Sequence, residues 1–172
     1  MNEGLLLLRL LLAVLLFGHA TQKLFGWFGG AGVAGTAEVF DRWGFVPARR
    51  MVLVAALAEL TGAAALAAGL LTPGGTAVVV GTMAVAATAT APQGFWAQKG
   101  GCEVPFVYGS VTAVLAFTGP GAWSLDHALG LTALHGPVWG LSALAVGLAA
   151  AAVPLTARAR VLRSRATPPT TR

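Results

Sequence analysis

The sequence has one cysteine, Cys102, and few charged residues for its length. A single cysteine excludes an internal disulfide and a CxxC pair, so the chain alone cannot carry out dithiol chemistry. Only 10% of the residues are charged, 56% are hydrophobic, and the mean hydropathy is +0.77. This composition is typical of a small polytopic membrane protein, in which abundant Gly and Ala let helices pack closely.

Cofactor and metal motifs are missing as well. No GK[ST] follows the Gly-rich segment 29–35, and no strand is expected before it, so it is not a phosphate loop. His127 and His135 form no metal-ligand cluster with Cys or carboxylate residues at a known spacing. With no haem ligand pair and no iron-sulfur cysteines, the sequence predicts no intrinsic cofactor and no metal, so a partner would have to supply any redox centre.

Five long apolar runs remain, and they predict an all-α membrane protein. We expect spans at 4–24, 51–71, 76–91, from 105 to before 119, and 137–155, the third and fourth of which are short for a bilayer. We expect an antiparallel four-helix core in residues 1–130, a fifth transmembrane helix in 131–157 and a basic tail in 158–172. Because the segment before the first run holds Glu3 and no Lys or Arg, and Arg9 interrupts the run itself, we expect it to be a membrane helix rather than a signal peptide.

The connectors carry further signals. Within the interfacial connector 25–50, Thr36 could cap a short helix that runs through Trp43. The TPGG segment at 72–75 is so short that the runs on either side of it must be antiparallel. His127 beside Asp126 is interpreted as a helix-start pair.

Basic residues decide the predicted topology. Five spans place the connector 23–50, the Lys99 loop and the tail on one side, whereas the loops on the other side contain no Lys or Arg. The positive-inside rule then predicts a multi-pass plasma-membrane protein with its N-terminus outside and its C-terminus in the cytoplasm. Membrane surface charge also explains the net charge of +5 better than nucleic-acid binding does, because the tail holds five of the eleven basic residues.

Glu59 is the most informative single residue, because it lies deep inside the second apolar run. An ionisable group at that depth costs at least ~3 kcal/mol unless it is neutral or paired, so it should face protein or a wet cavity. Small residues beside it indicate a tightly packed helix face; they are Ala58, Gly62, Ala65 and Gly69. Two interpretations stay open: a proton-handling or quinone-binding pocket, and a paired structural carboxyl that joins helices.

Arg9 and Lys23 are the candidate partners of Glu59, and they lie ~21 Å apart along one helix, so both cannot contact it. We expect Arg9 to be its partner and Lys23 to meet the loop from Lys99 to Glu103, although Lys23 could also simply reach the head groups. His19 could bind a quinone or relay a proton, or make an interhelical hydrogen bond. Trp96 could cover a ligand, or belong with the other tryptophans to an aromatic belt. The predicted polar pocket comprises Arg9, His19, Lys23, Glu59, Trp96, Lys99 and Glu103.

Four segments together resemble the DoxX family of small bacterial and archaeal membrane proteins. They are Arg9 with FGHATQKLFG at 17–26, the helix AELTGAAALAAGLLTP containing Glu59, FWAQKGGCE at 95–103, and GPGAWSLD at 119–126. The resemblance implies a four-helix membrane core and association with redox enzymes. One branch of the family is a thiosulfate:quinone oxidoreductase subunit, and another joins a superoxide dismutase and a sulfurtransferase in a membrane complex. The fifth helix and the basic tail depart from the family pattern.

Three functions follow as hypotheses. The first is a redox-associated membrane subunit, an incomplete oxidoreductase at most, that binds a quinone or similar small ligand around Glu59. The second is a non-catalytic scaffold or membrane-stress protein that docks soluble partners through its basic face. The third is a small transporter, against which the short spans and the absence of a repeat argue. The expected partners are the bilayer and redox proteins, with homo-oligomerisation left open.

Overall fold

The computed structural model describes residues 1–166, and within that range it contains helices and connectors but no strand. The long helices are α1 (Asn2–Phe25), α3 (Ala48–Ala68), α4 (Thr72–Thr90), α5 (Glu103–Thr118) and α7 (Pro137–Ala166). The shorter elements are η1 (Trp27–Gly29), α2 (Gly32–Arg42), η2 (Ala91–Gln93), η3 (Ala97–Lys99) and α6 (Leu125–Ala128). The predicted all-α fold is confirmed.

Four of these helices are long and apolar enough to cross a membrane: α1, α3, α4 continued through η2, and α7. The fifth apolar helix, α5, has 16 residues and reaches ~24 Å, which is short of the ~30 Å hydrocarbon core. The prediction that this span would be short therefore holds, and the protein is a multi-pass membrane protein.

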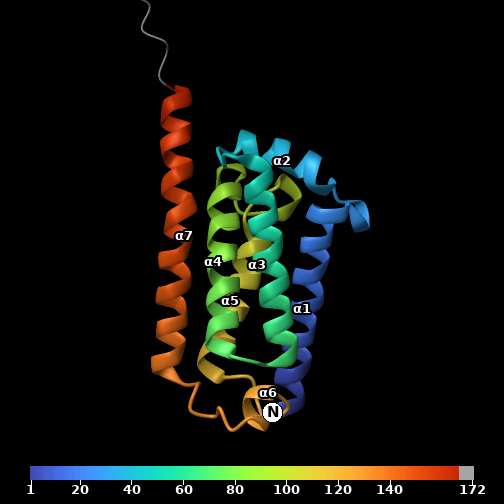
Figure 1. Ribbon diagram of the computed structural model, residues 1–172, viewed down its shortest axis with the longest axis vertical. Helices are drawn as coiled ribbons and strands as arrows, with labels where there is room; N and C mark the ends of the chain where they lie inside the picture. Colours follow the sequence, from blue (N-terminus) through green and yellow to red (C-terminus); the bar gives the residue numbers. More distant parts are fainter. Residues whose placement is uncertain (167–172) are drawn as a thin grey trace, which may run out of the picture.

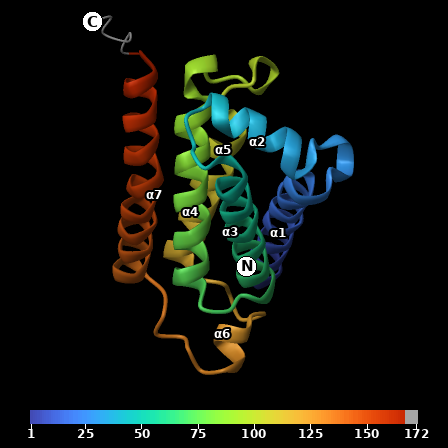
Figure 2. The ribbon, with the colours of Figure 1, turned by 45° about the horizontal axis from the view of Figure 1, so that its top comes forward.

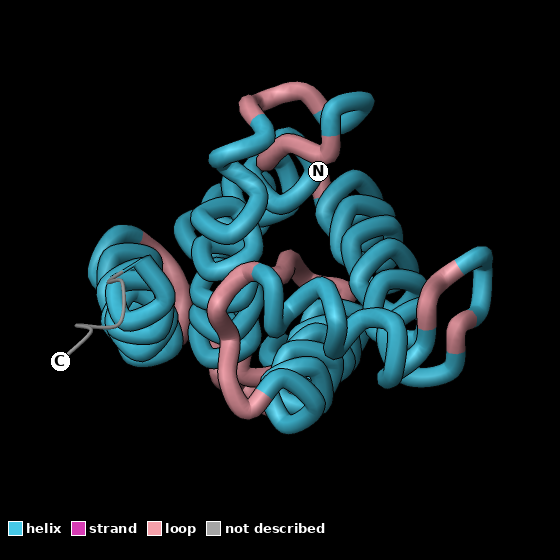
Figure 3. The backbone as a smooth tube through the Cα atoms, turned by 90° about the horizontal axis from the view of Figure 1, so that it is seen from above, coloured by secondary structure: helices cyan, strands magenta, loops and turns pink. Residues whose placement is uncertain are grey.

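The helices form an up-and-down bundle of α1, α3, α4 and α5, with α7 standing beside α4 (Figures 1 and 3). α2 lies across one end of this bundle, together with the loop between α4 and α5 (Figure 2). The C-terminal part of α7 lies at the same end (Figure 1). We call this the basic end, because its segments contain eight basic residues: Arg42, Arg49, Arg50, Lys99, Arg158, Arg160, Arg163 and Arg165. The turn 69–71 and the connector 119–136 form the opposite end and contain no Lys or Arg. The two ends are sorted by charge as predicted.

Two helices begin earlier in the chain than the sequence predicts. α3 begins at Ala48 rather than Met51, directly after Pro47, whose extended backbone serves as the N-cap. The TPGG segment is not a turn, because Thr72 and Pro73 open α4 and proline suits the first helical turn. The turn lies earlier, where Gly69 leaves α3 in the left-handed conformation (φ 59°).

Other boundaries shifted by a few residues. α1 extends one or two residues beyond each end of the expected 4–24 span, and α5 begins at Glu103 rather than Pro105. α2 begins at Gly32, so Thr36 lies inside it and does not cap it. All three differences lengthen a helix, which is common where frayed ends are stabilised by packing.

The largest difference is at the C-terminal end. α7 does not stop near Leu155 but continues to Ala166, so most of the predicted basic tail is helical; residues 167–172 lie outside the described range. Arg158 Nε donates to the carbonyl of Trp43 at 2.8 Å, and its guanidinium lies 5.8 Å from the centre of the Phe45 ring. Arg165 donates to the carbonyl and the carboxylate of Asp41, at 2.6 and 3.0 Å. The extension is helical because it packs against α2 and the turn that follows.

The interior of the bundle is apolar. One cluster of buried side chains joins α1, α3, α4 and α5 and contains Leu12, Ala13, Leu16, Ala63, Leu66, Val79, Met83 and Leu115. A second, smaller cluster joins α4, α5 and α7 through Ala77, Ala116 and Ala143. The small second cluster brings the α4 and α7 backbones close together.

Candidate functional site

Glu59 makes a two-oxygen ion pair with Lys23. Glu59 lies on the buried face of α3, is 4% exposed, and both its carboxylate oxygens lie 2.8 Å from Lys23 Nζ in the last turns of α1. A carboxylate that accepts two charge-assisted hydrogen bonds from a lysine is favourable where little water competes. The predicted inward orientation of Glu59 is confirmed, but its partner is Lys23.

The Lys23 ammonium has no donor left for a ligand. Besides its two bonds to Glu59, Nζ donates to the carbonyl of His19 at 3.3 Å, one turn earlier in α1. An ammonium has three N–H groups, and all three are used. The Lys23 side chain is 20% exposed, so the pair lies near the surface of the bundle at its edge, with Glu59 on the inner side.

His19 lies beside this pair and extends the polar region towards α5. Its ring meets Tyr108 edge-on, with the ring centres 5.6 Å apart. His19, Lys23 and Glu59, three of the seven predicted pocket residues, therefore come together, and Tyr108 joins them. Sequence reasoning did not single out Tyr108, although it is the only tyrosine of the chain.

The small-residue face predicted beside Glu59 packs against α4. A side chain added at Gly62 would collide with Val79, and one added at Gly75 would meet Ala65 Cβ at 2.6 Å. The backbones of α3 and α4 thus approach closely at Gly62 of α3 and at Gly75 of α4. This contact leaves Glu59 enclosed by protein on the α4 side.

Arg9 lies at the opposite end of the bundle and does not contact Glu59. It is 1% exposed, its Nη2 donates to the carbonyl of Trp123 at 2.5 Å, and its Nη1 packs against Gly69. Asp126 is close enough to attract the guanidinium electrostatically, but Nε and Nη1 have no hydrogen-bond acceptor in the described structure. The expectation that Arg9 would pair with Glu59 is therefore wrong. The end of α1 stands lower in Figure 1 than the start of α3. Lys23, in the last turns of α1, is the residue that contacts Glu59.

Asp126 was interpreted as half of a helix-start pair, and its main contacts are with α4. Its two oxygens accept from the Leu71 and Thr72 amides at 2.7 and 2.9 Å and from the Thr72 hydroxyl at 2.7 Å. The cap within α6 comes from Ser124, which accepts from the His127 amide at 3.2 Å. The signal that could have identified Asp126 is the Thr-Pro pair at 72–73, which marks a helix start whose free amides need an acceptor.

Three predicted pocket residues lie on the loop at the basic end. Trp96 is 57% exposed and packs edge-on against Phe95, and Lys99 is exposed. Glu103 accepts from the Ala97 amide at 2.8 Å and so closes its own loop. Lys23 does not reach this loop, because its donors are used by Glu59 and His19, and that expectation is wrong.

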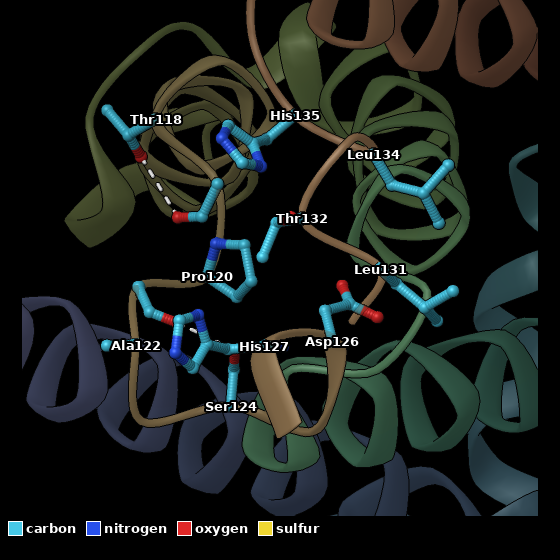
Figure 4. Close-up of a pocket in the computed structure, with 12 residues that line it drawn as sticks. Thr118, Pro120, Ala122, Ser124, Asp126, His127, Leu131, Thr132, Leu134 and His135 are labelled. Carbon is cyan, nitrogen blue, oxygen red and sulfur yellow. Dashed lines mark hydrogen bonds between the residues drawn. The ribbon is translucent and has the colours of Figure 1, made fainter. Parts of the chain in front are cut away.

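Neither of two hollows on the described surface is lined by Lys23 or Glu59. The first, about 200 Å³ in volume, lies in the connector 119–136 at the opposite end. His127, His135 and Thr132 border it, with Pro120 between the two imidazoles (Figure 4). The second is an apolar groove of about 370 Å³ between α1 and α3, bordered by Leu10, Ala13, Val14, Phe17, Leu60, Ala63, Ala64 and Ala67. Within residues 1–166 no group of three His, Cys, Asp or Glu side chains could hold a metal ion.

The two polar regions are separated by apolar packing. Leu12 and Leu16 lie between Arg9 and Lys23 along α1 and are buried with Leu66 of α3. The charged groups therefore form two separate local arrangements, one at each end, rather than a line of polar groups through the bundle.

The chain was compared with known proteins. The family model described as DoxX matches residues 4–92, just over half of the chain, from α1 to the end of α4 and η2. No curated protein and no solved structure gave a match. The matched segment contains Arg9, His19, Lys23 and Glu59, whereas the loop at 95–103 and the segment at 119–126 fall outside it. The chain belongs to the DoxX family.

Proposed function

We propose that the protein is a non-catalytic membrane scaffold subunit, which anchors partner proteins at the bilayer in an assembly associated with redox chemistry. The observation that carries this proposal is the closed state of the Lys23–Glu59 pair: both oxygens and all three ammonium protons are engaged. An ammonium whose three N–H groups are engaged stabilises helix packing but offers no donor to a substrate. The redox association is part of the proposal: it is what the resemblance to the described branches of the family implies, and the redox centre would then belong to a partner.

The experiment separates a structural ion pair from a reacting one. Replacing both members with apolar residues of similar size, Lys23→Met with Glu59→Leu, removes the pair without leaving a buried unpaired charge. For a scaffold, this double variant inserts in the membrane, keeps a thermal stability close to that of the natural protein, and retains the same co-purifying proteins in mild detergent.

Loss of co-purifying proteins or of a bound small molecule from a double variant that is still folded would contradict the scaffold proposal. Lys99→Met is the matched control, because it removes an exposed lysine at the same end of the bundle. It reports the effect of a lost surface charge alone.

A second candidate is a subunit that binds a quinone or a similar amphipathic ligand. The apolar groove between α1 and α3 favours it, because Phe17 and Leu60 in its wall lie within two residues of His19 and Glu59. A prenyl tail in this groove would bring its ring towards the polar region, where the ion pair would have to open to release a donor. Ala64→Phe fills the groove, so it should reduce quinone co-purification and any quinone-linked activity of the assembly, whereas Leu57→Phe, on the exposed side of α3, should not.

A small transporter is the third candidate and the weakest. A solute path needs polar groups or water along its length, whereas Leu12, Leu16 and Leu66 fill the bundle between its two polar regions. We therefore propose no transport activity.

A further inference from the structure

The turn between α2 and α3 carries three exposed arginines. Arg42 ends α2, and Arg49 and Arg50 lie in the first turn of α3, so nine residues of chain hold three cations. None of them makes an ion pair within residues 1–166. We call residues 42–50 the arginine turn.

Carboxylates at this end do not neutralise the arginine turn. Asp41 is engaged by Arg165 of α7, and Glu103 accepts from the backbone of its own loop. Glu38, one turn before Arg42 on α2, is exposed and makes no ion pair within residues 1–166. The local charge is therefore positive, with three arginines beside one unengaged carboxylate.

The arginine turn is held in one conformation by α7. Its Trp43 carbonyl accepts from Arg158, and Phe45 is 4% exposed beneath the same guanidinium. Gly44 has φ +87°, and a side chain there would meet Leu162 at 2.9 Å, so the turn fits closely against the α7 extension. A surface that is already ordered loses less entropy when it binds a ligand.

Exposed aromatic residues place this turn at the level of the membrane surface. Trp27 and Phe28 at the α1–α2 junction are 51% and 72% exposed, and Phe95 and Trp96 on the loop between α4 and α5 are 43% and 57% exposed. Both segments lie at the basic end (Figure 2). Tryptophan and other aromatic side chains gather at the boundary between head groups and hydrocarbon. The three arginines thus stand where lipid phosphates lie.

We propose that the arginine turn binds the phosphate head groups of anionic phospholipids. Arginine suits this ligand, because its guanidinium donates two parallel hydrogen bonds to phosphate oxygens and stays charged at the membrane surface. The connectors at the opposite end contain no Lys or Arg, so the same preference is not expected there. This inference goes beyond the scaffold function and does not depend on the identity of any partner.

The test measures lipid selectivity of the full-length protein. The natural protein in detergent is mixed with equal amounts of phosphatidylglycerol and phosphatidylcholine of the same chain lengths, and bound lipids are counted by native mass spectrometry. We expect phosphatidylglycerol to be preferred. Each arginine that is replaced by glutamine should lower this preference about fivefold. The variants are Arg42→Gln and the double variant Arg49→Gln with Arg50→Gln. Arg49→Lys with Arg50→Lys should keep most of it.

Arg160→Gln is the matched control, because it removes an exposed arginine at the same end but outside the turn. The proposal fails if the natural protein shows no preference for phosphatidylglycerol, as it would if the turn docked an acidic protein instead. It also fails if Arg160→Gln lowers the preference as much as the turn variants do, or if inorganic phosphate at the same concentration displaces the lipid. Circular dichroism of each variant checks that its helices are intact. If the double variant does not fold, the lipid preference of Arg42→Gln alone tests the proposal.

Discussion

The α1–α3 and α4–α7 contacts hold helices together in different ways. α1 and α3 are joined by leucines and by an ion pair between Lys23 and Glu59, 36 residues apart in sequence. α4 and α7 are joined by glycine: a side chain on Gly81 would meet the Gly147 carbonyl oxygen at 2.6 Å, and one on Gly147 would meet the Ala77 carbonyl oxygen at 2.5 Å. One contact depends on opposite charges, whereas the other depends on the absence of side chains.

The difference follows from what each contact has to specify. Two leucine-rich helices could slide past each other in lipid at little cost, and a single buried charge pair fixes their register. Two backbones in van der Waals contact are already fixed by shape, because sliding by one residue would place a larger side chain at the crossing. The family match covers α1, α3 and α4 but ends before α7, so the charged contact lies within the matched segment and the glycine contact connects it to the rest of the chain.

The largest expected effect comes from breaking the ion pair on one side only. Lys23→Met leaves the Glu59 carboxyl, which is 4% exposed, without its ammonium, and a buried charge that loses its partner typically costs about 3–5 kcal/mol. The measurement is the loss of helical signal on heating in detergent, with Lys99→Met expected to change little. Equal midpoints for the two variants would mean that the pair does not set the stability of the α1–α3 contact.

A smaller effect is expected from adding one methyl group to the glycine contact. Gly81→Ala places its Cβ against the Gly147 carbonyl, and the required shift of α7 should cost about 1–3 kcal/mol. Gly18→Ala in α1 is the matched control: no side chain and no other segment of the described structure lies within 4 Å of the new methyl group, apart from the two chain neighbours, and alanine favours a helix interior by about 0.5–1 kcal/mol. If both changes stabilise the protein, α4 and α7 are not in close backbone contact at Gly81.

The smallest effect is expected at the charged contact between α7 and α2. The side chains of Arg165 and Asp41 are 43% and 53% exposed, and exposed ion pairs contribute about 0–1 kcal/mol. Arg165→Gln should therefore shift the unfolding midpoint little, and less still in high salt. A loss as large as that of Gly81→Ala would show that α7 is held by charge as much as by shape.

Much of this arrangement could be predicted from local signals in the sequence. Apolar runs located the long helices, and small residues at three- and four-residue steps located the face of α3 that packs against α4. The cost of a charge in lipid required Glu59 to face protein, which it does. These conclusions need only the period of a helix and the cost of burying a charge, so one sequence is sufficient.

The partner of Glu59 could not be found in the same way. Arg9 and Lys23 were expected at similar distances from Glu59 along the helix axes. Which of them pairs with Glu59 depends on the axial offset between the end of α1 and the start of α3, and α2 and its connectors determine that offset. The cap from Asp126 to α4 was missed for a related reason, since 54 residues separate Asp126 from Thr72. Contacts between distant segments depend on offsets that no local pattern records.

The link from Arg9 to the Trp123 carbonyl spans 114 residues and imposes an order on biogenesis. When α1 first enters the membrane, the segment that will accept from Arg9 has not been synthesised, so this guanidinium must remain hydrated or near the bilayer surface. Lys23 finds Glu59 as soon as α3 emerges, 36 residues later. The pairing of the first two spans can therefore form early, whereas the Arg9 contact can form only after the connector beyond α5 has been translated.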